Sequence, residues 1–133
     1  MARRASSFGF LGMFGRSEDL RSIDAALRPV GLHKAVVPEG VKLALSRLMQ
    51  DEIGDPSPQA YAEACALLAY CMLGPDGFAG ANGEDAVAPM ERRIDAALAA
   101  GRGIDAGILL LAHHAGLIQP SVVARHGIAV DDA

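Results

Sequence analysis

Residues 57–75 read SPQAYAEACALLAYCMLGP, and this stretch specifies a helix at both of its ends. Ser57 can accept hydrogen bonds from the first free backbone N–H groups of a helix, and Pro58 suits the first helical position. Gly74 followed by Pro75 supplies a left-handed stop, beyond which a helix does not readily continue. We therefore expect one helix that begins at Pro58 and ends just before Gly74.

Between Ala64 and Leu73 this expected helix has no polar side chain except the tyrosine hydroxyl, so none of its faces prefers water. A helix that is apolar on all sides is normally buried. Its apolar part is too short to cross a bilayer, which needs roughly 20 apolar residues. We therefore expect other helices of the same chain to surround residues 58–73.

Length and composition favour an all-α fold. The 133 residues fit one domain that can bury a core. Alanine, the best helix former, is abundant, whereas β-branched runs are scarce, aromatic residues are few and tryptophan is absent. We predict an all-α, single-domain bundle of five to six helices around the central helix at 58–73. The helical domain is expected to cover residues 17–127, between a disordered basic tail at 1–16 and a C-terminal tail at 128–133.

Capping and stop residues delimit the remaining helices. We expect these helices over residues 18–28, 38–53, 86–100, 104–115 and 121–126. Their apolar stripes predict these inward-facing residues: Leu20, Ile23 and Leu27; Val41, Leu45, Leu48 and Met49; Val87, Met90, Ile94, Ala97 and Leu98; Ile104, Ile108, Leu111 and Ala115. Leu109 and Leu110 widen the last stripe enough to predict deep burial. The string IDAAL occurs at 23–27 and again at 94–98, which we interpret as coincidence in an alanine-rich chain rather than as a repeat architecture.

The segment over 74–83 has glycine at every third position. Its similarity to phosphate-binding loops is weak, because it lacks the Gly-Lys-Ser/Thr ending of a Walker loop and the strand that precedes a dinucleotide fingerprint. Its acidic neighbours disfavour a bound anion, and they also lack the ligand spacing of an EF-hand calcium loop. We expect a tight left-handed connection that Phe78 anchors to the core.

The net charge of −4 is unevenly distributed along the chain. Residues 1–47 carry eight basic and four acidic side chains, residues 48–91 carry eight acidic and no basic ones, and residues 92–133 carry four of each. Because the acidic middle would repel a phosphate backbone, we expect no nucleic-acid partner. The basic and acidic regions could meet on two copies or on a partner, although an ordinary solvated surface also explains such a pattern.

The first sixteen residues contain three arginines and no acidic side chain. Their apolar stretch is short and interrupted by glycines, and no small-residue cleavage site follows it, so a secretory signal is not indicated. We expect a poorly ordered tail, with translation from Met13 or a basic aromatic arm that docks on a membrane or partner as alternatives.

Histidines and cysteines are the candidates for chemistry, and none of them forms a recognised motif. His113 and His114 are adjacent in an expected helix, so their side chains diverge by roughly 100° and cannot readily hold one metal ion together. His114 and His126 each lie close before a glycine stop, where an imidazolium interacts favourably with the helix dipole. No serine lies in a GxSxG elbow, and neither Cys65 nor Cys71 has a CxxC partner or a nearby base. We expect no catalytic residue, no metal site and no cofactor.

The two cysteines face different sides of one helix and cannot bond to each other, and such free thiols suit a reducing cytoplasm. We interpret the chain as a small cytoplasmic helical module for protein–protein interaction or self-association, without catalytic activity and without a membrane span. The helix over 38–53 is the expected contact element, because Leu43, Ala44 and Met49 add apolar surface beyond its buried stripe. The alternative is a small-molecule or metal-binding protein, or an enzyme, with a pocket lined by histidines and tyrosines. The candidate binding residues from both interpretations are His33, Leu43, Met49, His113, His114 and His126.

Overall fold

The structure, a computed structural model, describes residues 18–128. These residues form six α-helices and three short 3-10 turns and contain no β-strand. A first helix covers residues 18–27 and is followed by η1 (Arg28–Val30), η2 (Lys34–Val36), α2 (Glu39–Ile53), α3 (Pro58–Asn82), η3 (Glu84–Ala86), α4 (Val87–Ala100), α5 (Ile104–His114) and α6 (Pro120–His126). The expected tail at 1–16 and all of the expected tail at 128–133 except Ile128 lie outside the described residues.

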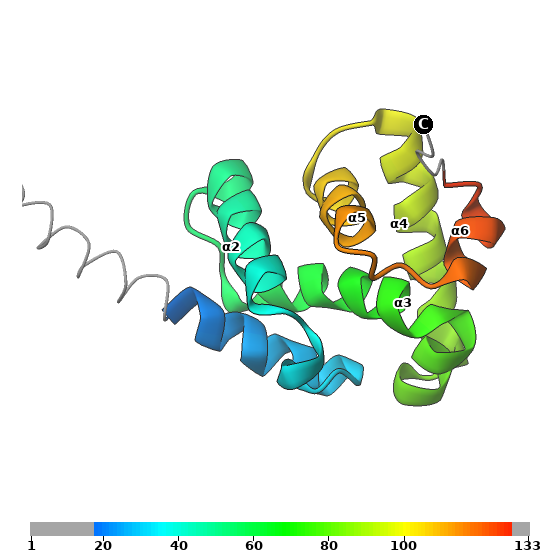
Figure 1. The fold of residues 1–133 in the computed structure, drawn as a ribbon, viewed down its shortest axis with the longest axis horizontal. Helices are drawn as coiled ribbons and strands as arrows, with labels where there is room; N and C mark the ends of the chain where they lie inside the picture. Colours follow the sequence, from blue (N-terminus) through cyan, green and yellow to red (C-terminus); the bar gives the residue numbers. More distant parts are fainter. Residues whose placement is uncertain (1–17, 129–133) are drawn as a thin grey trace, which may run out of the picture.

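Helix α3 is the centre of the fold, as the sequence predicted. It runs between the N-terminal part of the chain and the group formed by α4, α5 and α6, and it contacts η1, η3 and all three of these helices (Figure 1). Ser57 caps its start, where the hydroxyl oxygen accepts a hydrogen bond from the Ala60 N–H at 3.1 Å. Between Ala64 and Cys71 only Ala66 is not fully buried. The prediction of an all-α single-domain bundle around this helix is confirmed.

The expected stop at Gly74 is a break inside α3 rather than its end. Gly74 has φ 82° and ψ 170°, a conformation that is essentially restricted to glycine. Because Pro75 has no N–H, the Cys71 carbonyl loses its usual helical partner and accepts instead from the Gln119 backbone N–H at 2.9 Å. The Gln119 side-chain amide donates to the Met72 carbonyl, also at 2.9 Å. The segment before α6 therefore satisfies the carbonyls that the break exposes.

The chain beyond this break is helical to Asn82, so the prediction of a tight left-handed connection over 74–83 was wrong. The prediction rested on the four glycines of this segment, but glycine is tolerated in a helix that tertiary contacts stabilise. Phe78 is buried as expected, and its ring meets the edge of the Tyr70 ring at a centroid distance of 5.7 Å. This contact packs one ring from each half of α3 together across the break at Gly74.

Among the described residues, α3 is also the one helix that by length and composition could cross a membrane. Half of its most apolar 18-residue window is buried inside the protein. The core helix of a bundle passes the same test, so this property agrees with its central position and adds little beyond it.

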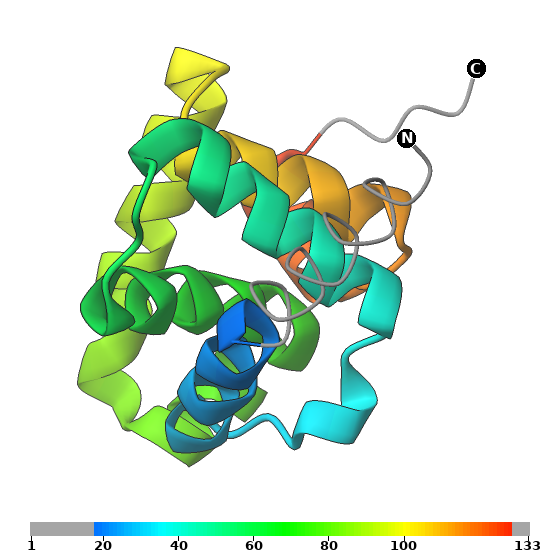
Figure 2. The same cartoon turned by 90° about the vertical axis from the view of Figure 1, so that its left-hand side faces the viewer.

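Helices α2 and α5 lie side by side on the face seen in Figure 2. Val41, Leu45 and Met49 of α2 are buried as predicted, whereas Leu48 is half-buried and packs against α5. On the other side of α2, the carboxylate of Asp19 in the first helix accepts a hydrogen bond from the Ser46 hydroxyl at 3.1 Å. Helix α2 is thus held between the first helix and α5.

Three predicted inward positions are wrong. Leu98 of α4 is 42% exposed, Leu110 of α5 is 59% exposed, and Ala115 is also exposed. Helix α5 instead buries the stripe of Ile108, Leu109 and Ala112. The sequence could not locate this stripe, because a helix that is apolar on most sides does not show which side its neighbours occupy.

Both cysteines are buried and unbonded, as expected. The Cys65 sulfur lies 3.8 Å from the Ile23 carbonyl oxygen of the first helix. Burial raises the pKa of each thiol to about 12, so neither is a thiolate near neutral pH. Cys65 and Cys71 therefore act as small packing residues of α3.

Candidate functional site

An extensive apolar hollow lies between the outer faces of α2 and α5. Its volume is about 810 Å³, and we call it the α2–α5 groove. It is lined by Pro38, Gly40, Val41, Ala44, Arg47, Leu48, Asp51, Gly107, Leu110, Leu111, His114 and Ala115. Apart from two charged side chains and one histidine, this lining is apolar, and glycine and alanine make up part of it.

Small residues explain why the groove exists. Gly40 and Ala44 keep the outer surface of α2 low, and Gly107 does the same at the start of α5. A Cβ at Gly107 would lie 2.8 Å from both terminal methyl carbons of Leu48, so glycine is what allows Leu48 to rest against α5. Leu48 therefore forms the floor, and the exposed Leu110 rises beside it.

The charged side chains of the groove are Arg47 and Asp51, one helical turn apart on α2 and both exposed. Neither takes part in an ion pair within residues 18–128. A second hollow, of about 620 Å³, adjoins the groove and shares Ala44, Arg47 and Asp51 with it. Leu43 and Asp19 also line this second hollow, so one continuous surface runs from the first helix across α2 to α5.

Two of the candidate binding residues belong to this surface. His114 lines the groove, and Leu43, which is 37% exposed, lines the adjoining hollow. Met49 does not belong to it, because its side chain is 1% exposed and faces the core. The sequence pattern placed Met49 both on the buried stripe and on the contact surface; its burial confirms the first assignment and shows that the second was wrong.

The remaining candidate histidines lie apart from one another. His33 caps η2, where its Nδ1 accepts a hydrogen bond from the Ala35 N–H at 3.0 Å. His113 lines a separate hollow beside α6, although its ring centroid is only 6.0 Å from that of His114. No group of three or more potential metal ligands occurs in the part of the chain that the structure describes.

His126 belongs to a chain of three polar side chains that the sequence did not reveal. The Tyr70 hydroxyl lies 3.1 Å from Nε2 of His126, and Nδ1 of that ring lies 3.2 Å from a carboxylate oxygen of Asp95. A Tyr–His–Asp series is compatible with proton transfer, but Tyr70 is fully buried and burial raises its pKa to about 12. Since no substrate can reach the hydroxyl, we interpret the series as the connection of α6 to α3 and α4.

Two further polar clusters also connect helices. The Asp19 carboxylate accepts hydrogen bonds from Tyr61, Ser46 and Gln50 at 3.1, 3.1 and 3.2 Å. Burial, followed by the charge of Asp19, raises the pKa of Tyr61 to about 12. These contacts fix the first helix to α2 and α3.

Arg93 of α4 forms a two-pronged contact with Asp105 of α5, at 3.0 and 2.8 Å, and also donates to the Glu63 carbonyl at 2.9 Å. A planar guanidinium suits this geometry, in which one side chain joins three helices. All three polar clusters thus have a structural role, and the α2–α5 groove with its adjoining hollow remains as the candidate functional site.

Comparison of the chain with protein-family models, with curated proteins and with solved structures found no significant match.

Proposed function

We propose that this protein is a helical interaction module that self-associates through the α2–α5 groove and has no catalytic centre. The main support is the groove itself, an apolar floor beside Arg47 and Asp51, which have opposite charges and make no ion pair within the described residues. An exposed apolar surface with charges near it is typical of a protein contact.

The occupant we propose is a second copy of the chain. In a two-fold symmetric dimer each surface patch meets its own equivalent. If the two α2 helices cross in antiparallel orientation, Arg47 of each copy faces Asp51 of the other, which gives two equivalent ion pairs. The small side chains at Gly40 and Ala44 allow the helices to approach closely, and Leu43 and Leu110 provide apolar area around them.

The alternative, a ligand pocket or an active site formed by several histidines, has less support. His114 is the one histidine in the groove, whereas His33 and His113 line other hollows and His126 is engaged with Tyr70 and Asp95. We keep the cytoplasm as the proposed location, because two buried free thiols suit a reducing compartment.

Sedimentation velocity of the full chain over a range of concentrations tests the proposal. We expect a reversible change from monomer to dimer, and we expect Arg47→Asp or Asp51→Arg alone to weaken the dimer by about tenfold. The double variant exchanges the charges and restores both pairs, so its dimer should be within a few-fold of the original.

A matched pair of exposed leucines supplies the control. Leu110→Ser, inside the groove, should weaken the dimer, whereas Leu98→Ser, on the exposed side of α4, should leave it unchanged. A chain that remains monomeric at every concentration, or a dimer that ignores the charge reversals, would contradict the proposal.

A further inference from the structure

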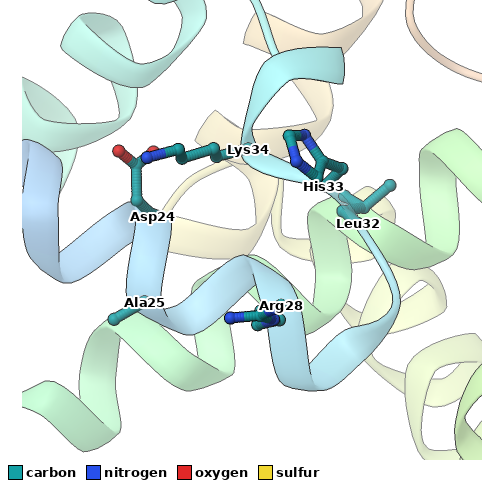
Figure 3. A pocket seen from close by; sticks show the side chains of 6 residues that line it. All are labelled: Asp24, Ala25, Arg28, Leu32, His33 and Lys34. Atoms are coloured by element: carbon teal, nitrogen blue, oxygen red, sulfur yellow. The ribbon is translucent and has the colours of Figure 1, made fainter.

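A different hollow, of about 460 Å³, lies between the first helix and the linker to α2. It is lined by Asp24, Ala25, Arg28, Leu32, His33 and Lys34, and Figure 3 views it from close by. Its volume lies within the range of small-molecule sites. It is distinct from the α2–α5 groove and shares no lining residue with it.

The hollow contains an acidic side chain, but a buried cation already compensates its charge. Lys42 of α2 is almost fully buried, and its ammonium lies 2.7 Å from the Asp24 carboxylate. A buried lysine needs such a partner, so the pair is a fixed part of the fold. Asp24 is therefore largely neutralised from the side of the core.

The basic side chains that line the hollow, Arg28 and Lys34, are not held in ion pairs in this way within the described part of the chain. Lys34 points toward Asp24 from the opposite wall in Figure 3, and Arg28 lies between the first helix and the linker. Neither takes part in an ion pair among residues 18–128. Because Lys42 and Asp24 cancel each other, Arg28 and Lys34 leave a local charge of +2 at the hollow.

The orientation of His33 adds a neutral donor. Because its Nδ1 accepts a hydrogen bond from the Ala35 N–H, the uncharged ring carries its proton on Nε2. An Arg fork, a Lys ammonium and an imidazole N–H can together donate to the several oxygens of one anion. Leu32 and Ala25 supply the apolar part of the lining.

We infer that this hollow binds the phosphate group of a small molecule, with Arg28, Lys34 and His33 as donors and the Lys42–Asp24 pair keeping the carboxylate from repelling it. Two negative charges on the phosphate match the local excess of +2. The apolar lining fits the organic part of a phosphate monoester rather than a free ion alone. This site does not depend on self-association, so either proposal can fail without the other.

The test is an NMR titration of the ¹⁵N-labelled full chain with inorganic phosphate, at an ionic strength held constant with sodium chloride. We expect saturable shifts confined to the amides around residues 24–35, with a dissociation constant of about 1 mM or below. Phenyl phosphate should bind more tightly, because its ring can contact Leu32 and Ala25.

The variants Arg28→Gln and Lys34→Gln should each weaken phosphate binding by about tenfold or more. Arg102→Gln, at an exposed position between α4 and α5, changes the net charge equally and should leave binding within about twofold. Circular dichroism verifies that all three variants fold. Scattered or non-saturating shifts, or an equal loss of binding in Arg102→Gln, would overturn the site in favour of general charge attraction.

Discussion

The break in α3 leads to a sharp prediction about two glycines of the same helix. Gly74 has φ 82° and ψ 170°, and a Cβ at this position would lie 3.1 Å from the Ser121 hydroxyl oxygen. Placing alanine in this backbone region costs about 1–3 kcal/mol. Alanine also lowers the conformational entropy of the unfolded chain, which offsets about 0.4–1 kcal/mol of this cost. We expect Gly74→Ala to lower the free energy of unfolding by about 1–3 kcal/mol once the contact with Ser121 is included.

Gly80→Ala is the matched control, since Gly80 is exposed, helical and has open space where a Cβ would stand. There alanine should raise the free energy of unfolding by about 0.5–1 kcal/mol. Urea unfolding followed by circular dichroism measures both changes. With a slope of about 2 kcal/mol per molar urea, Gly74→Ala should lower the midpoint by about 0.5–1.5 M and Gly80→Ala should raise it by about 0.3–0.5 M. Equal shifts in one direction would refute the broken-helix geometry.

Three further predictions concern other contacts of the fold. Gly31→Ala should lower the free energy of unfolding by more than about 3 kcal/mol in urea, because the added Cβ would lie 2.5 Å from the Ala81 Cβ and because Gly31 has a φ of +97°. A midpoint equal to that of the wild type would contradict this packing. His126→Ala should lower the free energy of unfolding by about 1–3 kcal/mol, since it leaves the buried Tyr70 hydroxyl without its hydrogen-bond partner. The control His113→Ala, at a half-buried histidine, should lower it clearly less, and equal losses would show that the Tyr70–His126 contact does not stabilise the fold. Stability should fall as the pH rises from about 9 to 12, because in this window the unfolded chain releases protons that the folded chain still holds. The groups responsible have pKa values raised from 9.0 or 10.0 to about 12, and they are Tyr61, Cys65, Tyr70 and Cys71. A stability that does not change with pH over this range would contradict their burial.

The sequence predicted the helices of this fold better than it predicted which residues contact one another between helices. The start of α3 and the break at Gly74 follow from local chemistry, because a cap, a proline and a glycine act on the residues next to them. The partner of the exposed Cys71 carbonyl could not be predicted in this way, since Gln119 lies 48 residues further along the chain. Hydrogen bonds of this kind depend on tertiary structure, which local patterns do not encode.

The repeated string IDAAL illustrates the same limit. Leu27 at the end of its first copy is fully buried, whereas Leu98 at the end of the second is 42% exposed. Asp24 pairs with Lys42, while Asp95 contacts His126. Identical residues thus have different surroundings, because the elements that pack against each copy differ.

The candidate site was only partly predictable for a related reason. Leu43 and Met49 are both apolar residues of α2, and the sequence assigned both to a contact surface. They differ by six positions, or about 600° of helical rotation, which leaves their side chains about 120° apart around the helix axis. Only knowledge of which side of α2 faces the core decides that Leu43 is exposed and that Met49 is buried.

This division of α2 into two sides also determines how the proposed self-association can be tested. Val41, Leu45 and Met49 stabilise the fold, whereas Arg47 and Asp51 are exposed and make no described ion pair, so charge reversals there should leave the free energy of unfolding nearly unchanged. A loss of association in a variant with normal stability would then result from the surface itself. Leu48 offers no such separation, because it packs against α5 and also forms the floor of the groove, and for that reason it is not among the diagnostic variants.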